Sequence, residues 1–261
     1  PLLVGTYDNH THLEIADGDQ PMDYQDHMSL AAQVGIIGAV QVGVTLESSK
    51  WCAEVAAKDS RLLAAVAIHP NEAAKYESKE ELDRDIAAIA ELANQPRVRA
   101  IGETGLDFFR TEDKKGIQFQ QYSFERHIAI AKEKGIALQI HDRDAHDKVV
   151  ETLLRVGPPS KVVFHCYSGD LELAKICTDN GWYASFAGNI TIKRNQHLRD
   201  SLKAMPTNQI LVETDAPFLT PEPLRGRPNA PYLVPITVRF MAEQLGMDAD
   251  ELSGQIALNT I

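Results

Sequence analysis

The chain has 261 residues, of which 44% are hydrophobic and 24% charged, a balance typical of a folded globular protein and not of a disordered one. Its formal net charge of −11 argues against a protein that coats DNA through a basic surface. It leaves open an enzyme that meets phosphate through bound divalent cations. No apolar run approaches the roughly 20 residues that a membrane-spanning helix needs.

The cysteines are few, odd in number and without C-x-x-C spacing: Cys52, Cys166 and Cys177. This pattern predicts reduced thiols in a cytoplasmic protein, and no secretory signal pattern is visible. We expect a monomer or weak oligomer with no membrane partner.

Apolar, β-branched runs alternate with longer amphipathic stretches along the chain. Several of these runs lack the alternation of a half-exposed strand, as expected for strands that are buried on both faces of a parallel sheet. The predicted strands are Leu3 to Tyr7, Ile37 to Val44, Leu62 to Ile68, Val98 to Gly102, Ile136 to Ile140, Val162 to Phe164, Tyr183 to Phe186 and Gln209 to Val212.

Helical patterns lie between these strands, and most of them stop at Gly, Asn or Pro. The predicted helices are Pro21 to Val34, Glu47 to Lys58, Lys79 to Asn94, Gly116 to Lys134, Arg143 to Val156, Asp170 to Asn180, Tyr232 to Leu245 and Asp248 to Leu258. His127, His146 and His197 fall in helical patterns and are predicted at the surface.

Eight β-α units predict an α/β fold, a single (β/α)8 TIM-type barrel formed by one domain over residues 1–261. The alternative is a doubly wound open sheet, but no G-x-G-x-x-G follows the first strand.

Polar side chains end most of the predicted strands, at the end where a (β/α)8 barrel carries its active site. His10 and His12 follow the first run with i, i+2 spacing, which places both rings on one face of a strand. The other strand-end residues are His69, Glu103, His141, His165 and Asp215. Five of the nine histidines thus end apolar runs, whereas chance placement would scatter them over helices and loops.

Six of these residues form a set of nitrogen and oxygen donors without thiolate, which suits Zn, Mn, Fe or Mg: His10, His12, Glu103, His141, His165 and Asp215. Six ligands are too many for one catalytic ion that keeps an open position. They suit two ions roughly 3.5–4 Å apart that share a carboxylate and activate a water. Structural alternatives remain, such as a turn former for Asp215 and a satisfied core histidine for His165.

The chain resembles the TatD family of metal-dependent deoxyribonucleases, in the amidohydrolase-like superfamily, through motifs that span nearly its whole length. The Asp-x-His-x-His pattern is common to many hydrolases, whereas the motifs at Glu103, His165, Asp215 and Arg227 are specific to the family. The matching segments are Asp8 to Leu13, Ile68 to Pro70, Ile101 to Asp107, Gln139 to Ala145, Phe164 to Gly169, Glu213 to Leu219 and Arg225 to Asn229. Asn71 departs from the pattern, because the family often has another histidine there.

The resemblance implies two divalent ions, of Mg, Mn or Zn, and a role for each residue. One ion would be held by His10, His12 and Asp215, and the second by His141 and His165. Glu103 would bridge the two ions, in the place that a carboxylated lysine fills in many relatives. The resemblance also implies substrate contacts: His69 looks like the phosphate-binding histidine of the family, and Arg143 and Arg227 belong to its motifs.

The predicted reaction is hydrolysis of phosphodiester bonds in DNA that is single-stranded or approached from a 3' or 5' end, as in DNA repair or degradation. Asp215 and Glu103 are the predicted catalytic residues, and Asp215 would accept the proton of the attacking water. Phe108, Phe109 and Tyr167 are candidates for stacking on exposed bases, with core packing as the alternative.

Two other functions remain open. The same ion pair could polarise a carbonyl or phosphoryl group of a small molecule, as in an amidohydrolase, lactonase or phosphotriesterase. A metal-binding module without catalysis is a more remote alternative, because the ligand set is complete and accompanied by an acid–base candidate.

Overall fold

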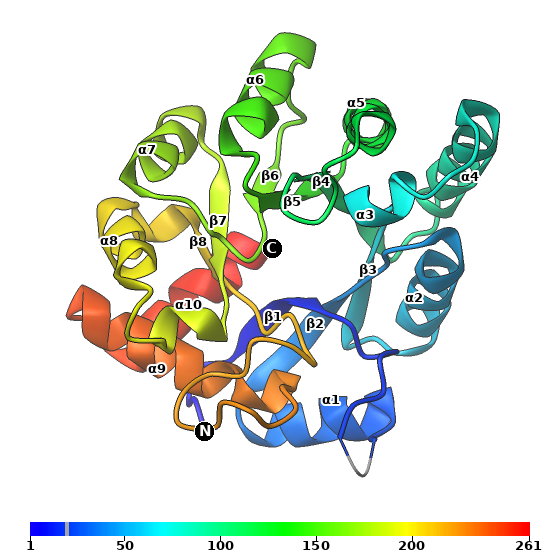
Figure 1. Ribbon diagram of the computed structural model, residues 1–261. Coiled ribbons are helices and arrows are strands. Elements are labelled where there is room, and N and C mark those ends of the chain that lie inside the picture. Colours follow the sequence, from blue (N-terminus) through cyan, green and yellow to red (C-terminus); the bar gives the residue numbers. More distant parts are fainter. Residues whose placement is uncertain (19–20) are drawn as a thin grey trace. The chain divides into compact units, whose positions relative to one another are not determined.

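Strands and helices alternate along the chain in the computed structural model, which describes residues 1–18 and 21–261 (Figure 1). All eight predicted strands are present and form one eight-stranded sheet in the order β1 to β8. They are β1 (Thr6–Thr11), β2 (Ile36–Val42), β3 (Leu62–Val66), β4 (Val98–Asp107), β5 (Ala137–Arg143), β6 (Val162–Phe164), β7 (Tyr183–Phe186) and β8 (Ile210–Val212). This alternation and strand order are those of a (β/α)8 barrel, which confirms the predicted fold class.

Three strands carry more of the motif residues than the sequence predicted. Strand β1 begins at Thr6 and runs through Thr11, and β4 and β5 extend to Asp107 and Arg143. Strands β4 and β5 stay paired this far in a parallel register, with Gly105 opposite His141. A side chain at Gly105 would lie 2.0 Å from the His141 carbonyl oxygen, so the close approach of the two strands requires glycine here.

The helices agree with the predicted ranges to within a few residues, but two of them, α3 and α8, were not predicted. They are α1 (Tyr24–Gln33), α2 (Leu46–Lys58), α3 (Pro70–Ala73), α4 (Lys79–Leu92), α5 (Lys114–Lys134), α6 (His146–Val156), α7 (Leu171–Asn180), α8 (Gln196–Ala204), α9 (Val234–Leu245) and α10 (Ala249–Thr260). Short 3-10 helices are η1 (Gly188–Thr191), η2 (Thr207–Gln209) and η3 (Pro231–Leu233). Among the residues that the structure describes, no helix has the length and apolar character that crossing a membrane requires.

The chain divides into two compact units, a central unit of residues 41–165 and a terminal unit of residues 1–40 and 166–261. In the central unit, β3 to β6 pair in parallel, helix α2 packs on β3 beside α4, and α5 packs on β4 (Figure 1). Its core contains fully buried aliphatic and aromatic side chains, among them Leu62, Ile86, Ile101, Phe124 and Ile140. The single domain over residues 1–261 stays a prediction.

In the terminal unit, β7 pairs with β8 in parallel, and β1 meets the end of β8 through a parallel bridge between Thr11 and Ala216. Helix α10 packs on β1 and β8, and α9 contacts both α8 and α10. The backbone amide of Asp215 donates to the His10 carbonyl at 2.9 Å, so the first and last strands hold the two predicted ligand segments side by side.

His127 on α5 is fully buried, which makes the predicted surface position wrong. Its Nε2 accepts a hydrogen bond from the Ile68 amide at 3.1 Å, and its Nδ1 lies 2.7 Å from the Ser123 carbonyl oxygen. Nδ1 therefore carries the proton of a neutral ring. Burial lowers the pKa of His127 to about 4, and the nearby Arg126 adds to this effect, while the hydrogen bond to Ser123 opposes it.

We expect His127 to make the protein sensitive to acid. Because its pKa of about 4 in the folded state is below the ordinary 6.5, the unfolded chain binds more protons between these values, and stability falls as the pH drops through this window. Between pH 7 and pH 5 the loss from this group is about 2 kcal/mol. His127→Gln keeps an acceptor for the Ile68 amide and loses the titrating group. Urea unfolding of wild type and His127→Gln at pH 7 and pH 5 should show that the variant loses less unfolding free energy at the lower pH. Equal losses in the two proteins would contradict the assignment of this acid sensitivity to His127.

Candidate metal centre

The first cluster consists of His10, His12 and Asp215, all in the terminal unit. His10 Nε2 and His12 Nε2 lie 3.2 Å apart, and Asp215 Oδ1 lies 3.3 Å from His12 Nε2 and 3.7 Å from His10 Nε2. Both histidines are buried, and the Asp215 side chain is 16% exposed. Three donor atoms therefore converge on one point, and the partly exposed Asp215 carboxylate leaves this point accessible to a small molecule.

Asp8 holds the backbone around the first cluster. Its Oδ1 accepts from the amides of His10 at 3.2 Å and Thr214 at 2.9 Å, and its Oδ2 accepts from the Thr214 hydroxyl at 2.6 Å. Burial raises the pKa of Asp8 to about 7, although these hydrogen bonds oppose the shift. Asp8 thus holds together the ends of the first and last strands through hydrogen bonds to their main chains. Asp215 comes directly after Thr214 and has φ +54°, a strained left-handed backbone conformation.

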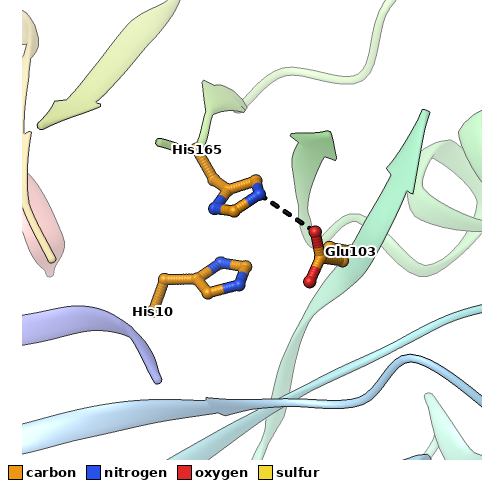
Figure 2. A group of neighbouring side chains, drawn as sticks. All are labelled: His10, Glu103 and His165. Carbon is orange, nitrogen blue, oxygen red and sulfur yellow. Dashed lines mark ion pairs between the residues drawn. The ribbon is translucent and has the colours of Figure 1, made fainter. Parts of the chain in front are cut away.

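The second cluster consists of His69, Glu103, His141 and His165 in the central unit. Glu103 Oε2 is its centre, at 3.0 Å from His165 Nε2, 3.1 Å from His141 Nδ1 and 3.5 Å from His69 Nε2. Figure 2 shows the ion pair between Glu103 and His165 as a dashed line. One buried carboxylate therefore faces three imidazole rings from three different strand ends.

Hydrogen bonds on the far side of two rings determine which nitrogen carries the proton. The Asn71 amide donates to His69 Nδ1 at 3.0 Å, so the neutral His69 ring has its proton on Nε2. His141 Nε2 lies 3.0 Å from Asp107 Oδ2, and its Nδ1 lies 3.1 Å from Glu103 Oε2, so the ring can donate to both carboxylates when it is protonated. In the neutral ring the proton stays on Nε2, which faces Asp107, and Nδ1 offers its lone pair. His69 consequently presents a donor to the cluster, whereas the neutral His141 ring would present Nδ1 as a ligand for a cation that displaces the Nδ1 proton.

Asp107 and Asn71 form a supporting layer for which the sequence had suggested no role. Besides His141, the Asp107 carboxylate accepts from the Asn71 amide side chain at 2.9 Å and from the backbone of Phe109 and Arg110 at 3.1 and 2.8 Å. Burial raises the pKa of Asp107, but the hydrogen bonds from His141, Arg110 and Asn71 outweigh burial and hold the pKa below its usual range. The charged carboxylate is thus the form that orients His141.

Replacing Asp107 with Asn should weaken divalent-metal binding by about 10- to 100-fold, the usual effect of removing a carboxylate behind a metal-binding histidine. The His141 ring loses the partner that fixes its tautomer, while its packing changes little. Competition with a chromophoric chelator would measure the affinity. Asp113→Asn, which changes an aspartate that caps helix α5 and does not touch the cluster, is the matched control. Equal affinities in wild type and Asp107→Asn would contradict this role.

Burial and neighbouring charges shift the pKa values of two histidines in opposite directions. Burial lowers the pKa of His69 to about 3, although Glu103 opposes this shift. Burial also lowers the pKa of His141, but its hydrogen bonds to Asp107 and Glu103 outweigh burial and leave the pKa raised. His69 is therefore a neutral donor at physiological pH.

The predicted substrate residues differ in their surroundings. The His69 ring points into the second cluster. The Arg143 guanidinium lies 4.0 Å from the centre of the Phe109 ring, and Phe109 is 54% exposed. Arg227 is exposed and lines a cleft in the terminal unit. Tyr167 is buried against Phe186, with ring centres 5.4 Å apart, so the alternative of core packing holds for this tyrosine.

The donor atoms of both clusters fit divalent ions. Donors around one tetrahedral ion with bonds of about 2.1 Å stand roughly 3.4 Å apart. The separations in the first cluster are 3.2 to 3.7 Å, and Glu103 lies 3.0 and 3.1 Å from His165 and His141 in the second. Neutral imidazole nitrogens and carboxylate oxygens suit Zn and Mn, and less so Mg.

Known proteins resemble this chain over nearly its full length. The sequence profile of the family described as TatD related DNase matches residues 7–261. A metal-dependent hydrolase named TatD from Mycobacterium tuberculosis is 38% identical over 249 residues, which cover 94% of this chain and 92% of the relative. A protein of Erwinia amylovora named 3'-5' ssDNA/RNA exonuclease TatD is 32% identical over 237 residues, or 88% of each chain.

Among solved structures, the TatD homologue YJJV of Escherichia coli superposes with a TM-score of 0.85 and 28% sequence identity, covering 98% of this chain and 96% of that one. The similarities in sequence and in structure lead to the same family as the strand-end donors. The chain therefore belongs to the TatD family and is a metal-dependent hydrolase of the class that acts on ester bonds.

Proposed function

We propose that this protein is a nuclease that hydrolyses phosphodiester bonds of single-stranded DNA with the help of two divalent ions. The observation that carries the proposal is the convergence of nitrogen and oxygen donors at strand ends, several of them buried, in small groups that could hold metal ions. The nuclease name of the Erwinia amylovora relative supports the choice of nucleic acid as substrate.

The hydrogen bonds support a division of roles among the histidines. We assign one ion to the first cluster and a second ion to Glu103, His141 and His165. His69 is left out because its Nδ1 is occupied by the Asn71 amide. The family resemblance assigns to Glu103 a share in both ions. When bound, the ions lower the pKa of a water and neutralise charge on the phosphate oxygens.

The side chains of the protein then bind the substrate and move one proton. Asp215 accepts a proton from the attacking water, since its carboxylate is the partly exposed member of the first cluster. His69 donates a hydrogen bond from Nε2 to a phosphate oxygen, which its low pKa favours because the ring stays a fixed neutral donor. Arg143 and Arg227 contact flanking phosphates.

Digestion of end-labelled single-stranded DNA with Mg, Mn or Zn tests this function. We expect the labelled strand to shorten with time, and the metal that gives the fastest cleavage would identify the class of the native ion. Blunt, ligated duplex circles should not be cut. A ladder from one end would identify an exonuclease, and internal fragments would identify an endonuclease. No cleavage with any metal, together with turnover of a lactone or a phosphotriester, would refute the nuclease and indicate a small-molecule hydrolase.

A further inference from the structure

A cleft of about 1040 Å³ opens in the terminal unit, and its lining includes Pro217, two positions after Asp215 of the first cluster. Its walls come from the segments after β1, β7 and β8, from helix α1 and from η3. The residues that matter below are His27, Asn189, Arg194, Arg225, Arg227 and Tyr232. In (β/α)8 barrels the loops after the seventh and eighth strands often bind phosphate. The volume is at the upper end of the roughly 300–1,000 Å³ of sites for drug-sized ligands, so the cleft has room for more than one nucleotide.

The cleft concentrates positive charge in a chain whose net charge is −11. Three arginines line it against one acidic residue, Asp17, whose carboxylate accepts a hydrogen bond from the Gly18 amide at 2.8 Å. The side chains of Arg194, Arg225 and Arg227 are exposed and make no hydrogen bond or ion pair with other residues in the described part of the chain. Unpaired guanidinium groups that share one concave surface attract a polyanion.

The walls of the cleft are held in place before any ligand binds. The buried Arg199 guanidinium donates to the carbonyls of Ile190, Ile192 and Lys193 at 2.8, 2.8 and 2.6 Å, which fixes the segment that leads into Arg194. The Glu222 amide donates to the Thr191 hydroxyl at 2.9 Å and so ties the two walls together. Fixed walls reduce the ordering entropy that binding would otherwise cost.

The cleft is joined to the first cluster by a short, braced turn. The Phe218 amide donates to the Asp215 carbonyl at 2.9 Å, and the Asn229 side chain donates to the carbonyls of Thr214 and Phe218 at 3.0 and 2.7 Å. A single strand of DNA whose reacting phosphate lies at Asp215 would therefore place its neighbouring nucleotides next to the arginines that line the cleft.

An aromatic surface lines the same cleft. The Tyr232 ring lies parallel to the His27 ring, with an interplanar angle of 17° and ring centres 6.2 Å apart, and Tyr232 is half-buried. Burial lowers the pKa of His27, although Asp23 and Asp26 oppose the shift, so this ring is uncharged at neutral pH. Paired aromatic rings beside arginines are the usual surface for single-stranded nucleic acid, because every base can stack on them.

We propose that this cleft binds the nucleotides of a single strand that adjoin the cleaved bond, with phosphates on Arg194, Arg225 and Arg227 and one base stacked on Tyr232. This inference rests on the proposed nuclease function and adds to it the path of the single strand and the residues that hold its phosphates and one of its bases.

Binding of a nuclease-resistant phosphorothioate single strand, followed by fluorescence anisotropy over a range of salt concentrations, tests the arginines. Arg194→Ala should weaken binding several-fold and reduce the slope of log affinity against log salt by about 0.7, the value for one lost phosphate contact on a single strand. Arg126→Ala removes the same charge from an exposed position on helix α5 and should keep the wild-type slope.

Base stacking is tested with a second pair of variants. Tyr232→Leu should weaken binding of the strand at least about fivefold, and Tyr232→Phe should restore it. A strand with abasic sites should bind wild type and Tyr232→Leu equally, which a mere loss of folding would not produce.

Cleavage of the unmodified strand by wild type is measured in parallel. Suppose that wild type cleaves the strand, but the salt dependence of binding is the same for Arg194→Ala as for Arg126→Ala, or Tyr232→Leu weakens binding of abasic and normal strands equally. The cleft is then not the site that binds the strand, whereas the nuclease assignment stands. If wild type neither binds nor cleaves any single strand, both proposals are overturned together.

Discussion

Replacing Glu103 with Gln should abolish hydrolysis, with a loss of more than about a hundredfold, because removal of a ligand exceeds the 10- to 100-fold effect of removing its supporting groups. Glu103 Oε2 lies within 3.5 Å of a ring nitrogen of each histidine in the second cluster, His69, His141 and His165. The amide has the same shape but no charge, so three neutral rings would face a cation without an adjacent carboxylate.

Thermal unfolding with and without added metal separates this effect from misfolding. Wild type should gain stability as metal is added, since an ion that binds only the folded state shifts the unfolding equilibrium. Without metal, Glu103→Gln should unfold at a temperature at least as high as that of wild type, because a buried charge is removed. Added metal should raise the unfolding temperature of the variant much less than that of wild type. Glu133→Gln, at an exposed position, is the control. Activity near that of wild type would refute the role of Glu103.

The double variant His10→Ala with His12→Ala should also lose activity by more than about a hundredfold, together with one bound ion. It removes two of the three donors of the first cluster and leaves a single carboxylate, which cannot compete with water for the ion. The second cluster lies in the central unit and keeps all its donors.

Elemental analysis of the purified proteins gives the number of ions per chain. We expect the double variant to hold one ion fewer than wild type, whereas His197→Ala, at an exposed position on helix α8, should match wild type in metal and activity. Retained activity, or an unchanged ion count with lost activity, would contradict the assignment of an ion to His10 and His12.

The sequence predicts the fold and the site donors for one physical reason. Strands buried on both faces must be apolar, so a polar residue at the end of such a run, such as His165 after Val162–Phe164, stands out. Helix α8 was not predicted, because its buried face includes Arg199, a residue whose guanidinium is satisfied by carbonyls of the irregular segment just before the helix. Apolar periodicity cannot indicate a buried charged side chain of this kind.

Support for the site was harder to predict than the site itself. Asp107 lies in a motif that resembles a loop, and only the pairing of β4 with β5 shows that it continues the strand and reaches His141. Asn71 departs from the family pattern, yet its backbone amide fixes the His69 tautomer and its side chain donates a hydrogen bond to Asp107. Such roles depend on contacts between segments far apart in the chain.

The hydrogen bond from Thr214 to Asp8 joins residues that are 206 positions apart in the chain. During synthesis, His10 and His12 are made early, but Asp215 completes their cluster only after most of the polypeptide has been made. All members of the second cluster, by contrast, lie within residues 69–165. Contacts of such long separation form late in folding. A growing chain that has not yet reached Asp215 would thus hold only the second cluster, so hydrolytic activity is expected only after most of the chain has been made.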